Sequence, residues 1–279
     1  MLEISNLHKS FRKKKVLKGI SINFKTGIYG LLGTNGAGKT TLMRCIVNLY
    51  NVTNGNIKFH GIDTVDNANY FKSIGYLPQK FGLFKELTVY EMLKYFALLK
   101  KLPKNSIDSY VKKSLEIVNL EDRTTDKIST LSGGMIRRLG IAQAILGDPK
   151  IIIFDEPTAG LDPEERIRFK NLLSDIKKDK TIIISTHIVE DVEACCDKIV
   201  IMNDGKILSE GTSEKIKSIA NGKVFEVKEG TKINSNHFVE KTFERNGENF
   251  SRILSSTNEG YKTLEPSIED GYMCILKGI

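Results

Sequence analysis

Apolar and polar positions follow two different periods along the chain. Three continuous apolar runs, "GIYGLLG", "IIIFDE" and "TIIIST", are typical of parallel strands that are buried on both faces. Segments with apolar residues three or four positions apart follow these runs and predict helices. Strands that alternate with helices indicate an α/β domain built on a mainly parallel sheet.

Helical periodicity is clearest after the first strand and again in the middle of the chain. A helix is predicted over 39–50. Thr88, with Glu91 three residues later, forms a capping box at the start of a longer helical stretch. Together with a helix over 135–146, this stretch forms an inserted helical subdomain of about 86–147. The predicted apolar faces consist of Leu42, Cys45, Ile46 and Leu49 in the helix over 39–50, and of Ile107, Val111, Leu115 and Val118 in the second helix of a stretch from about 86 to 127.

Hairpins mark the two edges of this domain. The first 25 residues alternate like two strands around a basic turn, so an N-terminal antiparallel β subdomain is expected before the core. Asp204-Gly205 is typical of a tight hairpin turn near the other edge. The pattern weakens after residue 220, which predicts one domain over 1–220 and a small C-terminal α+β appendage over 221–279.

Charge and cysteine content narrow the function only a little. The net charge is +8, and residues 1–120 hold 19 Lys and Arg against 7 Asp and Glu. Such a basic half suits a polyanion (nucleotide phosphate, nucleic acid or an acidic lipid face), but scattered solvated lysines explain it equally well. The four cysteines show no CxxC pair, which favours reduced thiols in a cytosolic protein. No apolar run approaches the ~20 residues that cross a bilayer, so membrane insertion is not expected.

The stretch "GTNGAGKT", residues 33–40, lies between a predicted strand and a predicted helix and matches the phosphate-loop pattern G-x-x-x-x-G-K-[ST]. Phosphate oxygens need close approach by several backbone N–H groups, which glycine permits because it has no Cβ. The helix that starts there adds free N–H donors and its positive dipole end. Lys39 can neutralise the β and γ oxygens, and the Thr40 hydroxyl can hold Mg²⁺.

Two acids, Asp155 and Glu156, end the apolar strand "IIIFDE". Burying adjacent carboxylates costs free energy unless a cation or a proton meets them. Beside a phosphate loop, Asp155 would bind Mg²⁺ or its waters and Glu156 would polarise a water for in-line attack. A solvated pair at a strand end is the alternative. Asp162 as N-cap and Pro163 at the first helical position then begin the next helix.

A second candidate cradle is "LSGGM", residues 131–135, which opens a helix with bare glycine amides and a serine hydroxyl. One nucleotide does not need two such cradles on one chain. A natural solution is that this cradle caps ATP that is held by another copy of the domain.

Together these motifs resemble those of the ATP-binding cassette (ABC) ATPases, and the resemblance covers residues 1 to about 220. The matching segments are the Walker A motif "GTNGAGKT", the Q-loop residue Gln79, the signature "LSGGM", the Walker B motif "IIIFDE", the D-loop "AGLD" at 159–162 and the switch residue His187. They occur in the family's order and with family-like separations. Thr34 replaces a frequent proline and Met135 a commoner glutamine, but the backbone cradle needs neither side chain.

The resemblance implies a P-loop NTPase core that binds ATP with Mg²⁺ and hydrolyses it. The implied catalytic residues are Glu156 as general base, His187 on the γ-phosphate, Lys39 and Gln79, and the implied metal site consists of Thr40, Gln79 and Asp155. The implied nucleotide contacts are Phe11 and Val16 for adenine, Gly33, Thr34, Asn35, Gly36, Ala37, Gly38, Lys39, Thr40 and Thr41 for the phosphates, and Ser132, Gly133, Gly134 and Asp162 across a dimer interface. A core aromatic in a hairpin is the alternative for Phe11.

The resemblance also implies partners. Two cassettes would close head-to-tail around two ATP molecules and drive a separate transmembrane permease subunit, which would hold this chain at the cytoplasmic face of the membrane. Phe81, Leu83 and Phe84 would help to form the dock for that subunit, unless they belong to the core of the helical subdomain.

The tail "LEPSIEDGYMCIL" resembles the end of cassettes that serve ABC-2 type exporters. Its alternative is a helix that packs against its own domain or its dimer mate. The competing function is a soluble ABC ATPase that acts on nucleic acid or ribosomes. A single cassette without heptads or CxxC pairs counts against it, so no nucleic-acid partner is expected.

Overall fold

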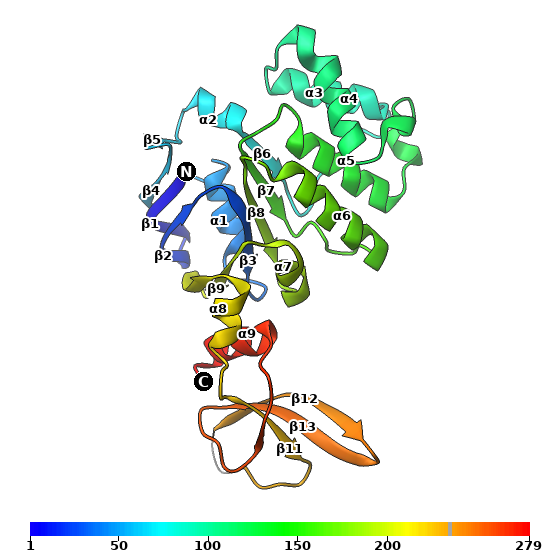
Figure 1. The fold of residues 1–279 in the computed structure, drawn as a ribbon. Coiled ribbons are helices and arrows are strands. Elements are labelled where there is room, and N and C mark those ends of the chain that lie inside the picture. The colour runs from blue at the N-terminus through cyan, green and yellow to red at the C-terminus, as the bar shows by residue number, and fades with distance from the viewer. Residues whose placement is uncertain (234–235) are drawn as a thin grey trace.

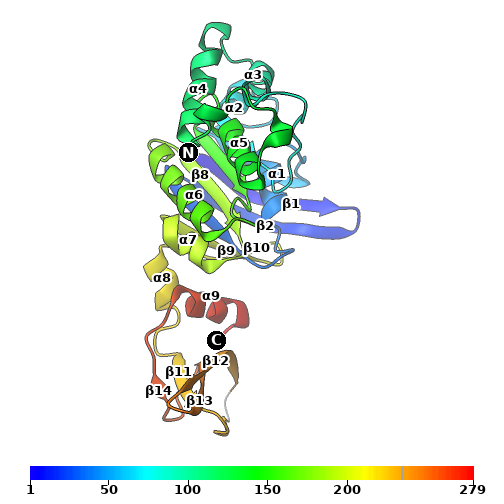
Figure 2. The ribbon, with the colours of Figure 1, turned by 90° about the vertical axis from the view of Figure 1, so that its right-hand side faces the viewer.

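The computed structural model describes residues 1–233 and 236–279. In this part of the chain an antiparallel sheet is followed by an α/β core with an inserted helical subdomain and then by a C-terminal sheet. The helical subdomain lies at one end of the molecule and the C-terminal sheet at the other (Figures 1 and 2).

The start of the chain forms the antiparallel sheet that its alternating pattern predicts. Its strands, in the order in which they pair, are β2 (Lys14–Phe24), β1 (Leu2–Phe11), β4 (Asn54–Phe59) and β5 (Ile62–Asp63). The hairpin of β1 and β2, with the basic turn at its tip, projects from the body of the molecule in Figure 2. Leu2, Ile4 and Leu7 of β1 are buried in a core cluster that this sheet shares with the central sheet.

The central sheet confirms the α/β class. Its strands, in order, are β10 (Lys206–Gly211), β9 (Lys198–Asn203), β3 (Gly27–Leu32), β8 (Thr181–Thr186), β7 (Ile151–Asp155) and β6 (Ile74–Leu77). All neighbours pair in parallel except β10, which is antiparallel to β9. Every residue of β7 and β8 is buried. Because β3, β7 and β8 are parallel, their carboxyl ends meet at one edge of the sheet, where the motif residues follow them.

Helices lie on both sides of this sheet (Figure 1). In the core they are α1 (Lys39–Ile46), α2 (Ala68–Ser73), α6 (Pro163–Ile176) and α7 (Val189–Cys195), and in the helical subdomain α3 (Val89–Leu99), α4 (Ile107–Ile117) and α5 (Gly133–Ile145). The capping box of Thr88 and Glu91 is present at α3, and Asp162 caps α6 with Pro163 in its first turn. The predicted apolar stripe of Ile107, Val111 and Leu115 in α4, with Val118 just after its end, is buried.

Alternate residues of β7 face two different cores. Ile151 and Ile153 pack in the cluster that contains residues of α1 and the N-terminal sheet. Ile152 and Phe154 pack in the cluster that contains residues of α5, α6 and the rest of the helical subdomain. The central sheet is therefore the middle layer, and both of its faces are closed to water at β7.

The helix predicted over 39–50 is wrong at its C-terminal end. α1 ends at Ile46, and Asn48 takes a left-handed φ of 56°, which a continuing helix does not allow. Leu49 therefore lies outside the helix and is 62% exposed, whereas the other three residues of the predicted apolar face are buried.

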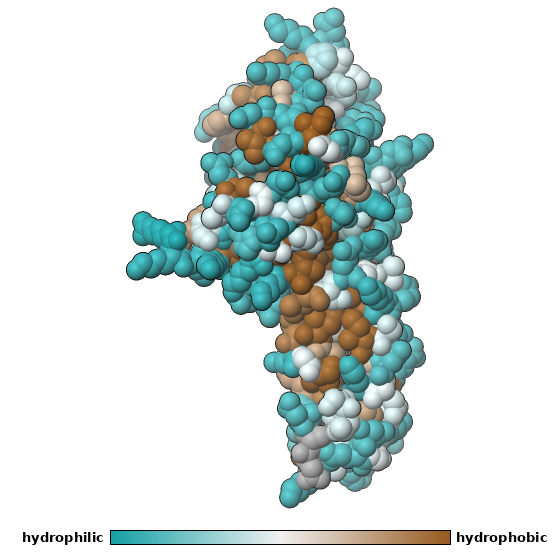
Figure 3. Space-filling view, turned by 90° about the vertical axis from the view of Figure 1, so that its left-hand side faces the viewer, coloured by the Kyte–Doolittle hydropathy of each residue, from teal (hydrophilic) through white to brown (hydrophobic). Residues whose placement is uncertain are grey.

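The C-terminal region combines a sheet with two helices. Its elements are α8 (Ser213–Ser218), β11 (Val224–Lys228), β12 (His237–Arg245), β13 (Glu248–Ser255), β14 (Lys262–Thr263) and α9 (Ile268–Lys277), and the sheet order is β12, β13, β11, β14. Ile268 and Tyr272 of α9 are buried beside Val189 and Val192 of α7. The tail helix thus packs against its own domain. Apolar side chains remain at the surface where this region meets the core (Figure 3).

Candidate active site

The loop between β3 and α1 presents backbone amides at the start of a helix. Gly38 is the N-cap residue of α1 and has a φ of 106°, a conformation that residues with a Cβ rarely adopt. The first N–H groups of α1 therefore lie at the positive end of the helix dipole, next to a loop residue that has no side chain. This arrangement is suited to phosphate oxygens.

The Lys39 ammonium lies inside this loop. Its Nζ donates hydrogen bonds to the carbonyl oxygens of Gly33 at 2.7 Å and of Thr34 at 3.1 Å. Burial lowers the pKa of Lys39, and the carboxylates of Glu156 and Asp155 oppose that shift. The loop thus holds a cation beside two acids, where it can bind the oxygens of a phosphate chain.

Asp155 ends β7 and is completely buried. Its Oδ1 accepts hydrogen bonds from Thr40 Oγ1 at 3.0 Å and from Ser185 Oγ at 2.7 Å. Its Oδ2 is buried and has no hydrogen-bond partner among the described residues. A buried carboxylate oxygen beside a hydroxyl is a donor set that Mg²⁺ prefers, so the residues present fit this ion.

Glu156 follows Asp155 and faces two polar side chains. Gln79 Nε2 donates a hydrogen bond to Glu156 Oε2 at 2.7 Å, and His187 Nδ1 lies 3.7 Å from Glu156 Oε1. The second distance is longer than a hydrogen bond. The backbone of Glu156 has a φ of 50°, which is uncommon for a residue with a side chain. The structure therefore places a carboxylate, an amide and an imidazole together at the edge of the sheet.

A cavity of about 600 Å³ lies over the phosphate loop. The predicted residues that line it are Phe11, Val16, Asn35, Gly36, Gly38, Lys39, Thr40, Thr41, Gln79 and Glu156. Phe11 is 40% exposed, and its ring meets the ring of Tyr50 edge-on, with 5.1 Å between the centroids. The Lys9 ammonium lies over the same ring, 4.8 Å from its centroid. Among the described residues, the predicted ones that do not border this cavity are Gly33, Thr34, Ala37, Asp155, His187, Ser132, Gly133, Gly134 and Asp162.

The signature residues form a separate feature. Ser132 is the N-cap of α5, and its Oγ accepts a hydrogen bond from the backbone N–H of Met135 at 3.3 Å. Asp162 has the same relation to α6 and accepts from the N–H of Glu165 at 2.8 Å. Ser132 and Gly133 are exposed. One chain therefore carries a helix N-terminus of the kind that binds phosphate outside its own nucleotide cavity.

Two further contacts around the site follow from strand order and were not predicted. Ser185 pairs with Asp155 in the register of β8 and β7, and its Oγ accepts a hydrogen bond from the N–H of Glu156 at 2.9 Å. Asp191 of α7 accepts hydrogen bonds from Thr158 at 2.6 Å and Thr186 at 3.2 Å. The polar end of "TIIIST" was the available signal for Ser185, because the ends of parallel neighbours lie side by side.

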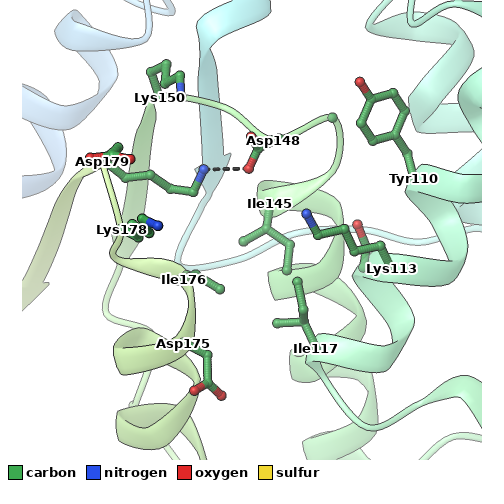
Figure 4. Close-up of a pocket in the computed structure, with 13 residues that line it drawn as sticks. Tyr110, Lys113, Ile117, Ile145, Asp148, Lys150, Asp175, Ile176, Lys178 and Asp179 are labelled. Atoms are coloured by element: carbon green, nitrogen blue, oxygen red, sulfur yellow. Dashed lines mark hydrogen bonds and ion pairs between the residues drawn. The ribbon is translucent and has the colours of Figure 1, made fainter.

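A smaller cavity of about 300 Å³ lies between α4, the turn after α5 and the turn after α6 (Figure 4). Lys180 Nζ donates a hydrogen bond to Asp148 Oδ1 at 2.5 Å across it, and this bond lowers the pKa of Asp148. None of the motif residues borders it among the residues that the structure describes. It is therefore separate from the nucleotide site.

Comparisons with known proteins show which family the chain resembles. The family model for the ABC transporter domain matches residues 17–159. The linearmycin resistance ATP-binding protein LnrL of Bacillus subtilis is 36% identical over 225 residues, which are 80% of this chain and 72% of that protein. The Nod factor export ATP-binding protein I of Burkholderia lata is 36% identical over 213 residues, or 75% and 70% of the two chains.

Larger relatives and a solved structure extend the comparison. ABC transporter A family member 8 of Dictyostelium discoideum is 39% identical, but the chain spans only 27% of its length. A dimeric ATP-binding cassette in a post-hydrolysis state, bound to ADP and Pi, matches with a TM-score of 0.69 and 25% identity over 76% of this chain and 98% of that one.

The chain belongs to the ABC transporter family, as an ATP-binding protein with the P-loop NTPase fold. It is an ATPase whose nucleotide is ATP and whose metal is Mg²⁺. Within 1–233 and 236–279, no helix combines the length and the apolar character needed to cross a bilayer.

Proposed function

We propose that this chain is the ATP-hydrolysing subunit of a membrane exporter, and that two cassettes close head-to-tail around two ATP molecules. The observation that carries the proposal is the separation of two half-sites on one chain. The phosphate loop lines the cavity, whereas Ser132 caps α5 outside it. A complete pocket then needs the signature of a second chain. The dimeric relative with bound ADP and Pi supports such pairing.

Binding of ATP is assigned to the residues around the large cavity. Phe11 and Val16 contact adenine at its rim, and the loop from Gly33 to Thr41 binds the phosphates. Lys39 exchanges its bonds to loop carbonyls for bonds to phosphate oxygens, which are charge-assisted and therefore stronger.

The catalytic step is assigned to the edge of the central sheet. Thr40, Asp155 and Gln79 would hold Mg²⁺ and its waters, and the ion, when bound, would supply positive charge to the phosphate oxygens. Glu156 accepts a proton from the attacking water. Gln79 fixes one oxygen of this carboxylate at 2.7 Å, and the other oxygen faces His187, which bonds the γ-phosphate.

Export through a separate transmembrane subunit is supported by two observations. Relatives of comparable length are named for Nod factor export and linearmycin resistance. Apolar side chains are also exposed on α3 and in the segment before it, namely Phe84, Tyr95, Leu98 and Leu99, and the rings of Phe84 and Tyr95 are in contact. Phe81 and Leu83 are half-buried against the core of that subdomain, so Phe84 is the strongest of the three predicted docking residues. The membrane subunit would hold the chain at the cytoplasmic face of the membrane.

Mixing two inactive chains tests the shared pocket. Lys39→Ala disables the phosphate loop and Ser132→Arg blocks the signature, so each variant alone should not hydrolyse ATP. In a head-to-tail pair of the two, one pocket combines the intact loop of one chain with the intact signature of the other. Hydrolysis should therefore return on mixing.

A second mixture is the matched control. Lys39→Ala with Glu156→Gln should stay inactive, because neither pocket of that pair contains both an intact loop and an intact base. Failure of the first mixture to recover hydrolysis would reject head-to-tail sharing. For the transport role, the chain should co-purify from detergent extract with a polytopic membrane protein, whereas nuclease-sensitive co-purification would favour the soluble ABC ATPase.

A further inference from the structure

Arg137 connects the signature helix to the catalytic edge of the sheet. It lies on α5, about one turn after Ser132, and its guanidinium points to the segment that follows β7. Nε donates a hydrogen bond to the carbonyl oxygen of Pro157 at 2.9 Å. One terminal nitrogen donates to the carbonyl of Gln79 at 3.3 Å, and the other to the carbonyls of Asp155 at 3.4 Å and of Glu156.

The backbone of Glu156 is held on both sides by side chains from other elements. Its N–H donates to Ser185 Oγ at 2.9 Å, and its carbonyl accepts from Arg137. The φ of 50° at Glu156 is a conformation that persists only when the surroundings determine it. Ser185 on β8 and Arg137 on α5 provide these constraints, so the direction of the Glu156 carboxylate depends on both.

The Q-loop is attached to the same part of α5. Arg137 Cζ lies 6.0 Å from the centre of the Phe81 ring. A Cβ on Gly140, one turn further along α5, would lie 2.5 Å from Phe81 Cζ, so this position must lack a side chain for the Q-loop to pack here. Arg137 thus holds the main chain of Gln79, while the Gln79 side chain holds Glu156.

A lysine could not make the same set of contacts. Arginine presents five N–H donors in a rigid planar fork, whereas a lysine ammonium is a single point of charge. The accepting carbonyls belong to Gln79, to Asp155 at the end of β7 and to the two residues after it, and together they accept from all three guanidinium nitrogens. Burial lowers the pKa of Arg137, and the negative charges of Asp155 and Glu156 partly offset this decrease.

We propose that Arg137 is a positioning residue for ATP hydrolysis. It lies on α5, the helix that carries the signature, and from there it fixes Glu156 and Gln79. In a pair, the signature end of α5 would contact the ATP of the other pocket, so the position of α5 at that pocket would affect the catalytic geometry of its own. The inference rests on the proposed function, in which Glu156 is the base and Ser132 reaches the ATP of a second chain. The two pockets of a pair would then be coupled through α5.

Arg137→Met, with Arg137→Lys and Arg138→Met beside it, tests the proposal. Arg138 is the matched control because it is the next residue of α5 and donates to the carbonyls of Val118 and Asn119, at the end of α4. We expect Arg137→Met to lower kcat roughly 10- to 100-fold, as loss of a supporting contact does at other sites, with KM for ATP within about threefold of the parent. Arg137→Lys should recover only a small part of kcat, and Arg138→Met should keep kcat near that of the parent.

A double variant separates positioning from a structural role. If Arg137 acts through Glu156, adding Arg137→Met to Glu156→Gln should lower the residual rate no further. Independent losses that multiply would overturn the inference, as would equal losses of kcat in Arg137→Met and Arg138→Met. Undiminished hydrolysis in Glu156→Gln would instead reject the proposed function, whereas loss in Glu156→Gln with full kcat in Arg137→Met rejects only the role of Arg137.

Discussion

The two features of this chain that are proposed to bind phosphate are built in opposite ways. At the phosphate loop, Lys39 and Asp155 are buried, and each makes two side-chain hydrogen bonds to its own chain. At the signature, Ser132 and Gly133 are exposed at the bare start of α5. Both features use the N–H groups of a helix start, yet only the first is enclosed by its own chain.

This difference teaches how one fold can make hydrolysis depend on association. In the proposed mechanism, the preorganised loop binds the phosphates before any partner arrives, because its charges are already desolvated and oriented. In the same mechanism, the exposed helix start gains a phosphate contact only when a second chain brings its nucleotide. Arg137 then links the two features within each chain, since it reaches from the exposed helix to the enclosed catalytic edge.

The largest effect is expected at the enclosed half-site. Glu156→Gln should lower hydrolysis roughly 10²- to 10⁴-fold, the usual contribution of a general base, and should leave ATP binding intact. Its pairs should accumulate with ATP, because the step that reopens them is blocked. Single-turnover hydrolysis and light scattering with Mg-ATP measure both results. Glu193→Gln, an exposed acid on α7, is the control. Turnover near that of the control would show that Glu156 is not the base.

The exposed half-site should fail in a different way. Ser132→Arg places a long cation at the start of α5, so ATP-dependent pairing should be lost while each single chain still binds ATP. Sedimentation with and without ATP, together with an ATP titration, separates these two properties. Ser174→Arg, at an exposed serine of α6, should pair normally. If the Ser132→Arg variant still formed pairs with ATP, Ser132 would not be part of a half-site that acts on a second chain.

Sequence reasoning found the motif-bearing parts of the molecule because their chemistry is local. The loop around Gly38, the cap at Thr88 and the acids that end β7 each depend on neighbours within a few residues, and the structure brings Lys39, Asp155, Glu156 and Gln79 to one sheet edge. The predicted length of the first helix was wrong. The helix ends because Asn48 adopts a left-handed conformation, and the spacing of apolar residues does not reveal this.

The parts that the sequence did not reveal depend on contacts between distant segments. Arg137 meets the end of β7 about 20 residues later in the chain, as 155–157 fold back onto α5. In the C-terminal region, Arg252 joins Glu240 of β12 and Asp270 of α9. Neither contact involves residues that belong to a motif or to a periodic pattern in the sequence, so each contact becomes visible only in the tertiary structure.

A smaller effect is expected at the rim of the nucleotide cavity. Phe11→Leu keeps an apolar contact but removes the aromatic ring, so KM for ATP should rise about 2- to 10-fold, from the ~0.5–1.5 kcal/mol of an aromatic pair. kcat should not change, because Phe11 is remote from Glu156 in the proposed mechanism. Steady-state kinetics measures both constants. Phe71→Leu, at an exposed aromatic outside this cavity, should match the parent. An unchanged KM in Phe11→Leu would assign Phe11 to the packing of the hairpin.

The smallest effect on hydrolysis is expected in the C-terminal region, where the half-buried acid Glu240 has no part in either half-site. Burial and the neighbouring Asp270 carboxylate raise the pKa of Glu240 to about 7. Because the pKa is higher in the folded state than the ~4.3 of an unfolded chain, the folded protein binds this proton more tightly. The stability that it adds is present below the unfolded pKa and is lost as the pH rises through about 7. Glu240→Gln, which stays neutral, should lose less thermal stability than the parent between pH 6 and pH 8.

Melting curves of the two proteins at both pH values test this expectation, with ATP hydrolysis measured beside them. Glu244→Gln, at an exposed acid of the same strand, should follow the parent in its melting. Identical pH dependence in Glu240→Gln and the parent would show that this carboxyl group is not the one that titrates. A large loss of hydrolysis in Glu240→Gln would instead show that the C-terminal region affects catalysis, through the contact of α9 with α7.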